Sequence, residues 1–245
     1  MSDHAIFPII ILNGRPAAGK SELLDFLRKL PDDVRRSRFH IGKMHEIDDF
    51  PMLWTWFEED DILQNTFGLP RLYSTPEGYF LQVELWHLLV ERLSLEYGKL
   101  LRDNPDLGQT HTVLIEFSRG SEHGGYQAAY PHLSDAILDA GAILYIDVPY
   151  AESLRKNQRR YNPDKPDSIL EHGLSDSKLE RLYKTVDWAE VTAQAAETIG
   201  IRDYRVPYVV FDNHDDVTTT LGPVFEARLQ TVLATLWERW TKRRS

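Results

Sequence analysis

The segment that most constrains the fold runs from an apolar stretch, Ile6–Leu12, through a glycine-rich loop into a helical pattern that opens at Ser21. The loop reads Gly14-Arg-Pro-Ala-Ala-Gly19-Lys20-Ser21 and matches G-x-x-x-x-G-K-[ST] at each fixed position. This motif works at the junction of a strand and a helix, where backbone N–H groups and the helix N-terminus face an anion. The sequence therefore predicts a phosphate-binding loop between a buried strand and a helix.

The loop positions have distinct expected roles in binding a nucleoside triphosphate. The two glycines let the backbone curl toward phosphate oxygens. Lys20 is expected to reach the β- and γ-phosphates, and the hydroxyl of Ser21 to coordinate Mg²⁺. The residues predicted to bind the nucleotide are Gly14, Arg15, Pro16, Ala17, Ala18, Gly19, Lys20 and Ser21.

Apolar runs alternate with helical patterns along the rest of the chain. Strands are expected at Ile6–Leu12, around Phe39–Ile41, and at Thr112–Phe117, Ala142–Val148 and Val206–Asp212. Helices are expected at Ser21–Leu30, Glu77–Leu101, Tyr126–Ala140, Lys178–Ile199 and Val217–Lys242. This alternation predicts βαβ units and a three-layer α/β/α fold whose five-stranded parallel sheet is covered on both faces.

Composition narrows the class of protein. The net charge of −10 argues against a broad nucleic-acid surface, because phosphate backbones are bound by dense Lys and Arg. The chain has no cysteines, which excludes disulfides and cysteine metal sites, and no apolar stretch reaches the roughly 18 residues of a membrane span. We expect a cytoplasmic protein with no membrane partner. Its oligomeric state is left open.

Residues 1–245 are expected to form a single domain with two additions. Residues 44–105 are interpreted as an acceptor-cap insertion and residues 150–180 as a lid-like segment, because each follows a strand and overhangs the sheet edge. Aromatic side chains between Phe50 and Tyr79 would stack on a planar ring or form the core of a small helical subdomain. His123, Gly124 and Gly125 are candidates for a loop near the acceptor.

Charged residues at predicted strand ends are the catalytic candidates. Glu116 ends an apolar strand and is expected to act on Mg²⁺ together with Ser21, although a structural pair with Arg119 is the alternative. Asp48 is favoured over Glu46 as the base that orients an acceptor hydroxyl, and a solvated acidic turn is the alternative. The catalytic candidates are Lys20, Asp48, Glu116, Arg119, Arg155 and Arg159.

Several of these segments resemble the P-loop nucleoside and nucleotide kinase superfamily. Val113-Leu-Ile-Glu116-Phe-Ser-Arg119 is similar to its strand-end acid and arginine, with two residues between them where the family has none. Leu144-Tyr-Ile-Asp147-Val-Pro149, followed by Arg155 and Arg159, resembles the strand and lid arginines of thymidylate kinases. Val206–Asn213 resembles the last strand and adenine-side loop, which implies that Asn213 contacts the nucleotide.

The resemblance implies a sheet ordered 2-3-1-4-5 and an activity that depends on ATP and Mg²⁺. Transfer of the γ-phosphate to a small-molecule acceptor, a nucleoside or nucleotide among the candidates, is the leading hypothesis. The acidic residues of 44–76 tilt it toward a nucleoside or another neutral hydroxyl compound. A toxin-like or antibiotic-modifying kinase is the enzymatic alternative, and an ATP-binding switch is the non-catalytic one. A GTPase is disfavoured because Phe211-Asp212-Asn213-His214-Asp215 stands where N-K-x-D is expected.

Overall fold

The computed structural model describes residues 5–160 and 174–244, and a mostly parallel sheet lies at its centre. In this part of the chain, six strands follow the order β2-β3-β1-β4-β6-β5. They are β1 (Ile9–Gly14), β2 (Lys43–Asp48), β3 (His111–Glu116), β4 (Gly141–Asp147), β5 (Thr198–Ile201) and β6 (Tyr204–Asp212). All neighbouring strands pair in parallel except β5, which pairs antiparallel with β6.

The prediction of five strands in the order 2-3-1-4-5 was wrong at one edge. The fifth parallel strand is β6, and the additional strand β5 lies outside it. Its segment, Thr198–Ile201, begins within the last two residues of a predicted helix, Lys178–Ile199. A four-residue edge strand that alternates buried and exposed side chains leaves no continuous apolar run in the sequence.

Helices cover both faces of the sheet, and except for the first, those predicted from the sequence are shorter than their patterns suggested. They are α1 (Lys20–Lys29), α2 (Asp32–Phe39), α3 (Asp49–Phe67), α4 (Glu84–Asp103), α5 (Leu107–Thr110), α6 (Gly125–Ala129), α7 (Asp135–Ala140), α8 (Tyr150–Arg160), α9 (Asp176–Tyr183), α10 (Trp188–Thr192), α11 (Val217–Thr220) and α12 (Pro223–Arg244). Two 3₁₀ turns, Ser121–His123 and Tyr130–His132, flank α6. Pro131 and Pro223 interrupt two predicted helices, since proline cannot continue a helix from within.

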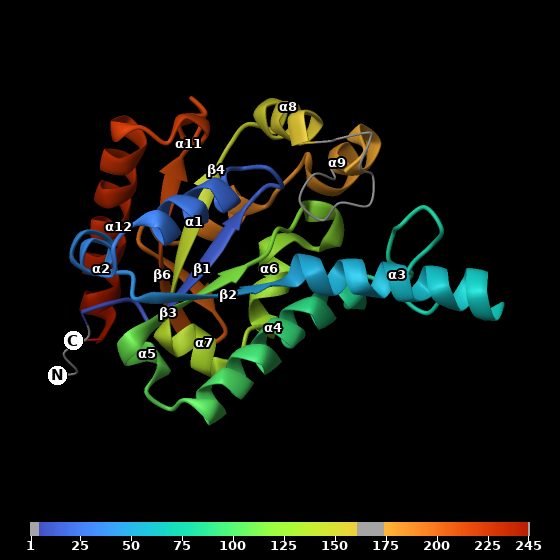
Figure 1. Cartoon of the computed structure of the whole chain (residues 1–245), viewed down its shortest axis with the longest axis horizontal. Helices are drawn as coiled ribbons and strands as arrows, with labels where there is room; N and C mark the ends of the chain where they lie inside the picture. The colour runs from blue at the N-terminus through green and yellow to red at the C-terminus, as the bar shows by residue number, and fades with distance from the viewer. Residues whose placement is uncertain (1–4, 161–173, 245) are drawn as a thin grey trace.

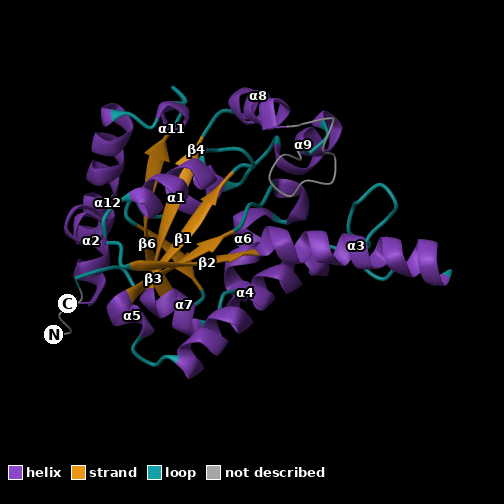
Figure 2. Cartoon of the chain, in the orientation of Figure 1, coloured by secondary structure: helices purple, strands orange, loops and turns teal. Residues whose placement is uncertain are grey.

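Two apolar cores, one on each face, make the fold a three-layer α/β/α arrangement. Successive side chains of a strand point to opposite faces, so Ile10 and Leu12 of β1 join one core and Ile9 and Ile11 the other. The first core is closed by α1, α2 and α12, and the second by α4, α6 and α7. Figures 1 and 2 show these helices around the sheet.

The second strand was predicted around Phe39–Ile41 and lies instead at Lys43–Asp48. Phe39 ends α2, and both Phe39 and Ile41 are buried in the first core. Strand β2 is an edge strand with the sequence Lys-Met-His-Glu-Ile-Asp, and most of its side chains remain partly exposed. A half-solvated edge strand carries few apolar residues, so its position was hidden in the sequence.

Helix α3 leaves the end of β2 and projects away from the body of the molecule (Figure 1). The buried carboxylate of Asp60 ties the returning chain to it by accepting hydrogen bonds from the backbone N–H groups of Leu72, Tyr73 and Ser74. This projecting element falls within residues 44–105, which were interpreted as an acceptor cap. That interpretation stays a prediction, as does the division into one domain with a cap and a lid.

None of the helices in the described ranges combines the length and apolar character that crossing a bilayer requires.

Candidate functional site

The glycine-rich loop lies where the sequence placed it, between β1 and the first turn of α1. Gly14 has φ +151° and Gly19 has φ +108°, backbone conformations that other residues rarely adopt. A Cβ atom at Gly14 would lie 2.7 Å from the carbonyl oxygen of Ile146, and one at Gly19 would lie 2.5 Å from the Thr218 hydroxyl. Both glycines are therefore required for the curl of the loop.

The Lys20 ammonium is held at the mouth of this loop. Its Nζ donates to the carbonyl oxygen of Arg15 at 3.1 Å and to the Ser118 hydroxyl at 3.0 Å, and lies 3.7 Å from a carboxylate oxygen of Glu116. The side chain is nearly buried. The contacts fix a positive charge beside the helix N-terminus, where a phosphate group would be attracted.

Three carboxylates gather next to Lys20. In the β2–β3 ladder Asp48 pairs with Glu116, and Asp49 follows as the first residue of α3. Asp48 was expected to follow a strand, but it is the last residue of β2 and also the N-cap of α3, accepting from Phe50 N–H at 3.0 Å. Two parallel strands ending at one edge thus bring distant acidic residues together.

The electrostatics of this cluster favour a protonated carboxyl. Burial, followed by the charges of Glu116 and Asp49, raises the pKa of Asp48 to about 8. Burial also raises the pKa of Asp49, against the opposing effect of Arg119. A carboxylate with a pKa near neutrality is suited to general base catalysis. By contrast Glu46, the second candidate base, is exposed and pairs with Arg28 at 2.6 Å.

The acidic partner of Arg119 is Asp49, whereas the sequence had suggested Glu116 as its structural partner. The guanidinium, with 1% of its surface exposed, donates to Asp49 at 2.7 Å and to the carbonyl oxygens of Ser118 and Trp86. It also lies 5.3 Å from the centroids of the Trp86 and Phe117 rings. The side chain therefore locks the β3 end to α3 and α4.

Replacing Arg119 with Ala is expected to lower the free energy of unfolding by about 3–5 kcal/mol, because a buried Asp49 carboxylate loses its partner. The double variant Arg119→Ala, Asp49→Asn should recover a large part of that loss, since the neutral amide leaves no buried charge. Urea unfolding of the wild type and of the two variants measures both effects. An Arg119→Ala variant as stable as the wild type would contradict this structural role.

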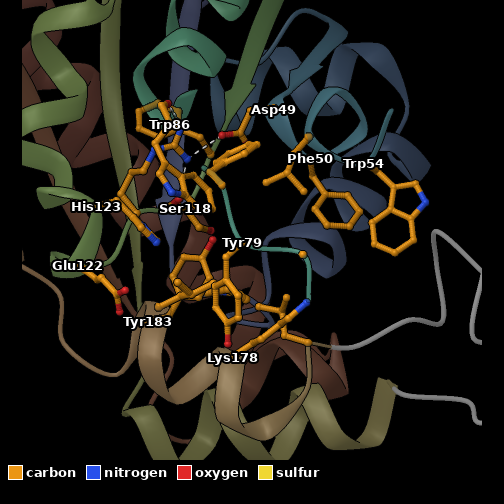
Figure 3. A pocket seen from close by; sticks show the side chains of 18 of the residues that line it. Asp49, Phe50, Trp54, Tyr79, Trp86, Ser118, Glu122, His123, Lys178 and Tyr183 are labelled. Carbon is orange, nitrogen blue, oxygen red and sulfur yellow. Dashed lines mark hydrogen bonds and ion pairs between the residues drawn. The ribbon is translucent and has the colours of Figure 1, made fainter. Parts of the chain in front are cut away.

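A cavity of about 550 Å³ opens from the P-loop and is walled by these groups. It extends from Lys20 and Ser21, past Asp48 and Glu116, to an aromatic region. Figure 3 shows Trp86 and His123 on one side of it and Phe50 and Trp54 on the other, with Tyr79, Tyr183 and Lys178 below. Its volume lies within the range of sites for small molecules.

Two glycine contacts hold the Ser118–Gly125 segment against this cavity. A Cβ atom at Gly120 would overlap the carbonyl oxygen of Leu182, so α9 packs directly on the backbone there. Gly125 has φ +66°, and Asp187 caps the following turn by accepting from the backbone N–H groups of Tyr126 and Gln127 at 2.8 Å. These contacts place His123 in the cavity wall, and a role of this loop near an acceptor stays a prediction.

Arg15 ties the P-loop to α9. Its guanidinium donates to the carbonyl oxygens of Val148, Tyr183 and Lys184 at 2.9–3.2 Å. The loop arginine is thereby engaged by the backbone at the ends of β4 and α9. No pattern in the sequence signals this bridge, because all three acceptors are main-chain carbonyl oxygens.

The nucleotide candidate Asn213 and the catalytic candidates Arg155 and Arg159 lie outside the cavity lining. Asn213 is buried, and its amide donates to the carbonyl oxygen of Ala18 and to the Thr218 hydroxyl, so it braces the P-loop. Arg155 pairs with Glu152 and with Asp216 at 2.6 and 2.7 Å, and Arg159 is exposed on α8. A charge clamp by these arginines stays a prediction and would require Arg155 to leave its carboxylates. Residues 161–173 of the lid-like segment lie outside the described ranges.

The donor set beside the loop fits Mg²⁺ that arrives with a nucleotide. Ser21 and Glu116 line the cavity, and Mg²⁺ prefers oxygen ligands such as their hydroxyl and carboxylate groups. Among the described residues, no group of three or more His, Cys, Asp or Glu side chains forms a metal-binding cluster. A magnesium ion that keeps water and phosphate ligands needs only one or two protein groups of this kind.

Comparison with known proteins identifies no family. No family model matches the chain, and no curated protein matches it. Among solved structures, a protein from Thermus thermophilus is similar at 17% identity, with 95% of this chain and 98% of that one covered and a TM-score of 0.42. A sugar kinase from Janibacter sp. is similar at 12% identity, with 93% and 96% covered and a TM-score of 0.38. Neither similarity is strong enough to support an argument about function.

Proposed function

We propose that the protein is a phosphotransferase that moves the γ-phosphoryl group of ATP to a small molecule bound in the aromatic cavity. One observation carries the proposal: the glycine-rich loop, with Lys20 at its mouth, opens into the same cavity as a carboxyl group whose pKa is raised to about 8. A protein that only binds a nucleotide as a switch needs the phosphate-binding loop but no site for a second reactant. The adjoining cavity provides a place for a second reactant.

The residues divide into a phosphate side and an acceptor side. Lys20 and the first turn of α1 would bind the β- and γ-phosphates, while Ser21 and Glu116 would hold Mg²⁺. Bound Mg²⁺ supplies charge neutralisation for the transferring phosphoryl group. Lys20 adds a fixed cation at the same place, and its contact with Ser118 aligns it toward the cavity.

Asp48 would act on the acceptor hydroxyl. In the transfer step a new bond forms between the acceptor oxygen and the γ-phosphorus, and the bond from that phosphorus to the ADP oxygen breaks. The hydroxyl proton passes to the Asp48 carboxylate, which a pKa of about 8 makes a competent base near neutral pH. The electron pair of the broken bond leaves with ADP.

Release of ADP from Mg-ATP across a panel of nucleosides, nucleotides, sugars and other hydroxyl compounds tests the proposal. We expect one class of acceptor to raise the rate well above the rate without acceptor. Tight ATP binding with a rate that no acceptor changes would contradict the phosphotransferase and favour an ATP-dependent switch.

A further inference from the structure

The cavity wall contains a buried histidine with no hydrogen-bond partner. Only 3% of the surface of His123 is exposed, and neither ring nitrogen is hydrogen-bonded within the described part of the chain. Its ring stacks on Trp86, with centroids 3.9 Å apart, and meets Tyr183 edge-on at 5.7 Å. Buried polar groups are nearly always satisfied, so an orphaned imidazole at a cavity points to a missing partner.

The His123 imidazole is neutral in this position. Burial, followed by the charges of Arg119 and Arg181, lowers the pKa of His123 to about 3. A neutral imidazole offers one donor and one acceptor. Tyr183, whose side chain carries a hydroxyl group, also lines the cavity. Together they present a small set of hydrogen-bonding groups on an aromatic surface.

The positive charges of the cavity are already engaged by carboxylates. Arg119 pairs with Asp49 and Arg181 with Glu122, each at 2.7 Å, and Lys20 lies 3.7 Å from Glu116. In the described ranges, each arginine that lines the cavity is already ion-paired, so none is available to form a bidentate contact with a phosphate of the acceptor.

Among the residues that the structure describes, Lys178 is the lining cation that makes no ion pair with a carboxylate, and its environment is poor for an anion. Its ammonium lies 5.3 Å from the centroid of the Tyr79 ring, and burial lowers the pKa of Lys178. The surrounding wall is aromatic, formed by Phe50, Trp54, Phe57, Tyr79, Phe80 and Trp86. Such surfaces favour flat, weakly polar rings.

We propose that the acceptor is an uncharged alcohol with a flat aromatic or heteroaromatic body, and that His123 recognises it by hydrogen bonding to a polar group of that ring. This inference rests on the proposed function and specifies its acceptor. Compounds that already carry a phosphate group are excluded from the cavity. His123 is thus a specificity-determining residue whose ring nitrogens have no hydrogen-bond partner among the described residues.

The proposal makes opposite predictions for stability and for binding. His123→Phe keeps a ring against Trp86 and removes both nitrogens, so it deletes a buried polar group that has no partner. We expect the melting temperature to rise by about 2–4 °C. We expect the affinity for ring alcohols to fall about tenfold, as the loss of a good hydrogen bond implies.

The probes are matched pairs of ring alcohols and their phosphate esters: thymidine with thymidine 5′-monophosphate and pyridoxine with pyridoxine 5′-phosphate. Quenching of tryptophan fluorescence in the full-length protein reports binding, because Trp54 and Trp86 line the cavity. At least one alcohol should bind the wild type at least tenfold more tightly than its ester. His87→Phe is the matched control: it removes another unpaired buried nitrogen, outside the cavity lining, and should leave binding unchanged.

The inference would be overturned by esters that bind as well as the alcohols, or by alcohols whose binding His123→Phe leaves intact. Binding by none of the alcohols would overturn it as well. Titration with a fluorescent ATP analogue and Mg²⁺, run on the same samples, separates this failure from that of the proposed function. Loss of the ring-alcohol site with intact nucleotide binding contradicts only the acceptor class, whereas absent nucleotide binding contradicts the phosphotransferase itself.

Discussion

Replacing Lys20 with Ala is expected to lower phosphoryl transfer by about 10³-fold or more, because the γ-phosphate loses the fixed cation that neutralises it in the transition state. The ammonium is positioned by the Arg15 carbonyl oxygen and the Ser118 hydroxyl, so no neighbouring lysine can replace it in that geometry. The expected cost to stability is small, because Glu116 keeps partial access to solvent. Turnover with the best acceptor and thermal unfolding measure the two effects separately.

Lys29→Ala is the matched control for this variant. Lys29 belongs to the same helix, is largely exposed and pairs with Asp25, four residues earlier. Its removal should change turnover less than twofold, since exposed ion pairs of this kind contribute little. A Lys20→Ala protein that retains wild-type turnover would eliminate the role assigned to the P-loop.

Asp48→Asn is expected to lower kcat/KM by about 10²- to 10⁴-fold, the usual contribution of a positioned base. In the wild type, kcat/KM should rise with pH up to about 8 and then level, because burial and the two neighbouring carboxylates raise the pKa of Asp48 to about that value. The variant should show no such rise. Asn can still cap α3 through the hydrogen bond from Phe50 N–H.

The same variant should be more stable than the wild type above neutral pH. The folded-state pKa of Asp48 lies above its unfolded value near 3.8, so the ionised form is disfavoured by folding. The wild type therefore loses stability as pH rises from about 4 through 8, and Asn removes that loss. The gain in melting temperature should be largest above pH 8 and vanish near pH 4.

Glu46→Gln separates the two acidic candidates of β2. Glu46 lies two residues before Asp48, pairs with Arg28 outside the cavity, and should be dispensable for turnover. If Glu46→Gln abolished activity and Asp48→Asn did not, the assignment of the base would be reversed. If both variants kept full activity, the acidic cluster would have no role in the transfer step.

The sequence was sufficient to predict the strands at the centre of the sheet but not those at its edges. Strands β1, β3 and β4 are buried on both faces and are therefore continuous apolar runs, which pattern analysis recognises. The edge strands β2 and β5 pack on one side only, and their alternating polar residues look like loop or helix. The position of β2 mattered most, because it determines where Asp48 and Asp49 lie.

The part of the site that a local motif defines could be predicted from the sequence. The parts that depend on tertiary packing could not. Gly14 through Ser21 form a contiguous motif whose geometry follows from its own residues. The pairing of Arg119 with Asp49 joins residues 70 positions apart, and the sequence offered Glu116 as the nearer partner. Helix α9 supplies Lys178 and Tyr183 to the cavity wall, and its position depends on the close approach of Leu182 to Gly120. Only the folded chain reveals that contact.

The most direct test of the phosphotransferase is the fate of the γ-phosphate. The protein is incubated with Mg²⁺, ATP labelled in its γ-phosphate, and a ring alcohol that binds the cavity, and the products are separated. The account predicts that the label appears in an organic phosphate ester, in proportion to ADP formed, and that Lys20→Ala abolishes it. Label found only in inorganic phosphate, at a rate that the alcohol does not change, would contradict transfer and leave an ATP hydrolase or switch.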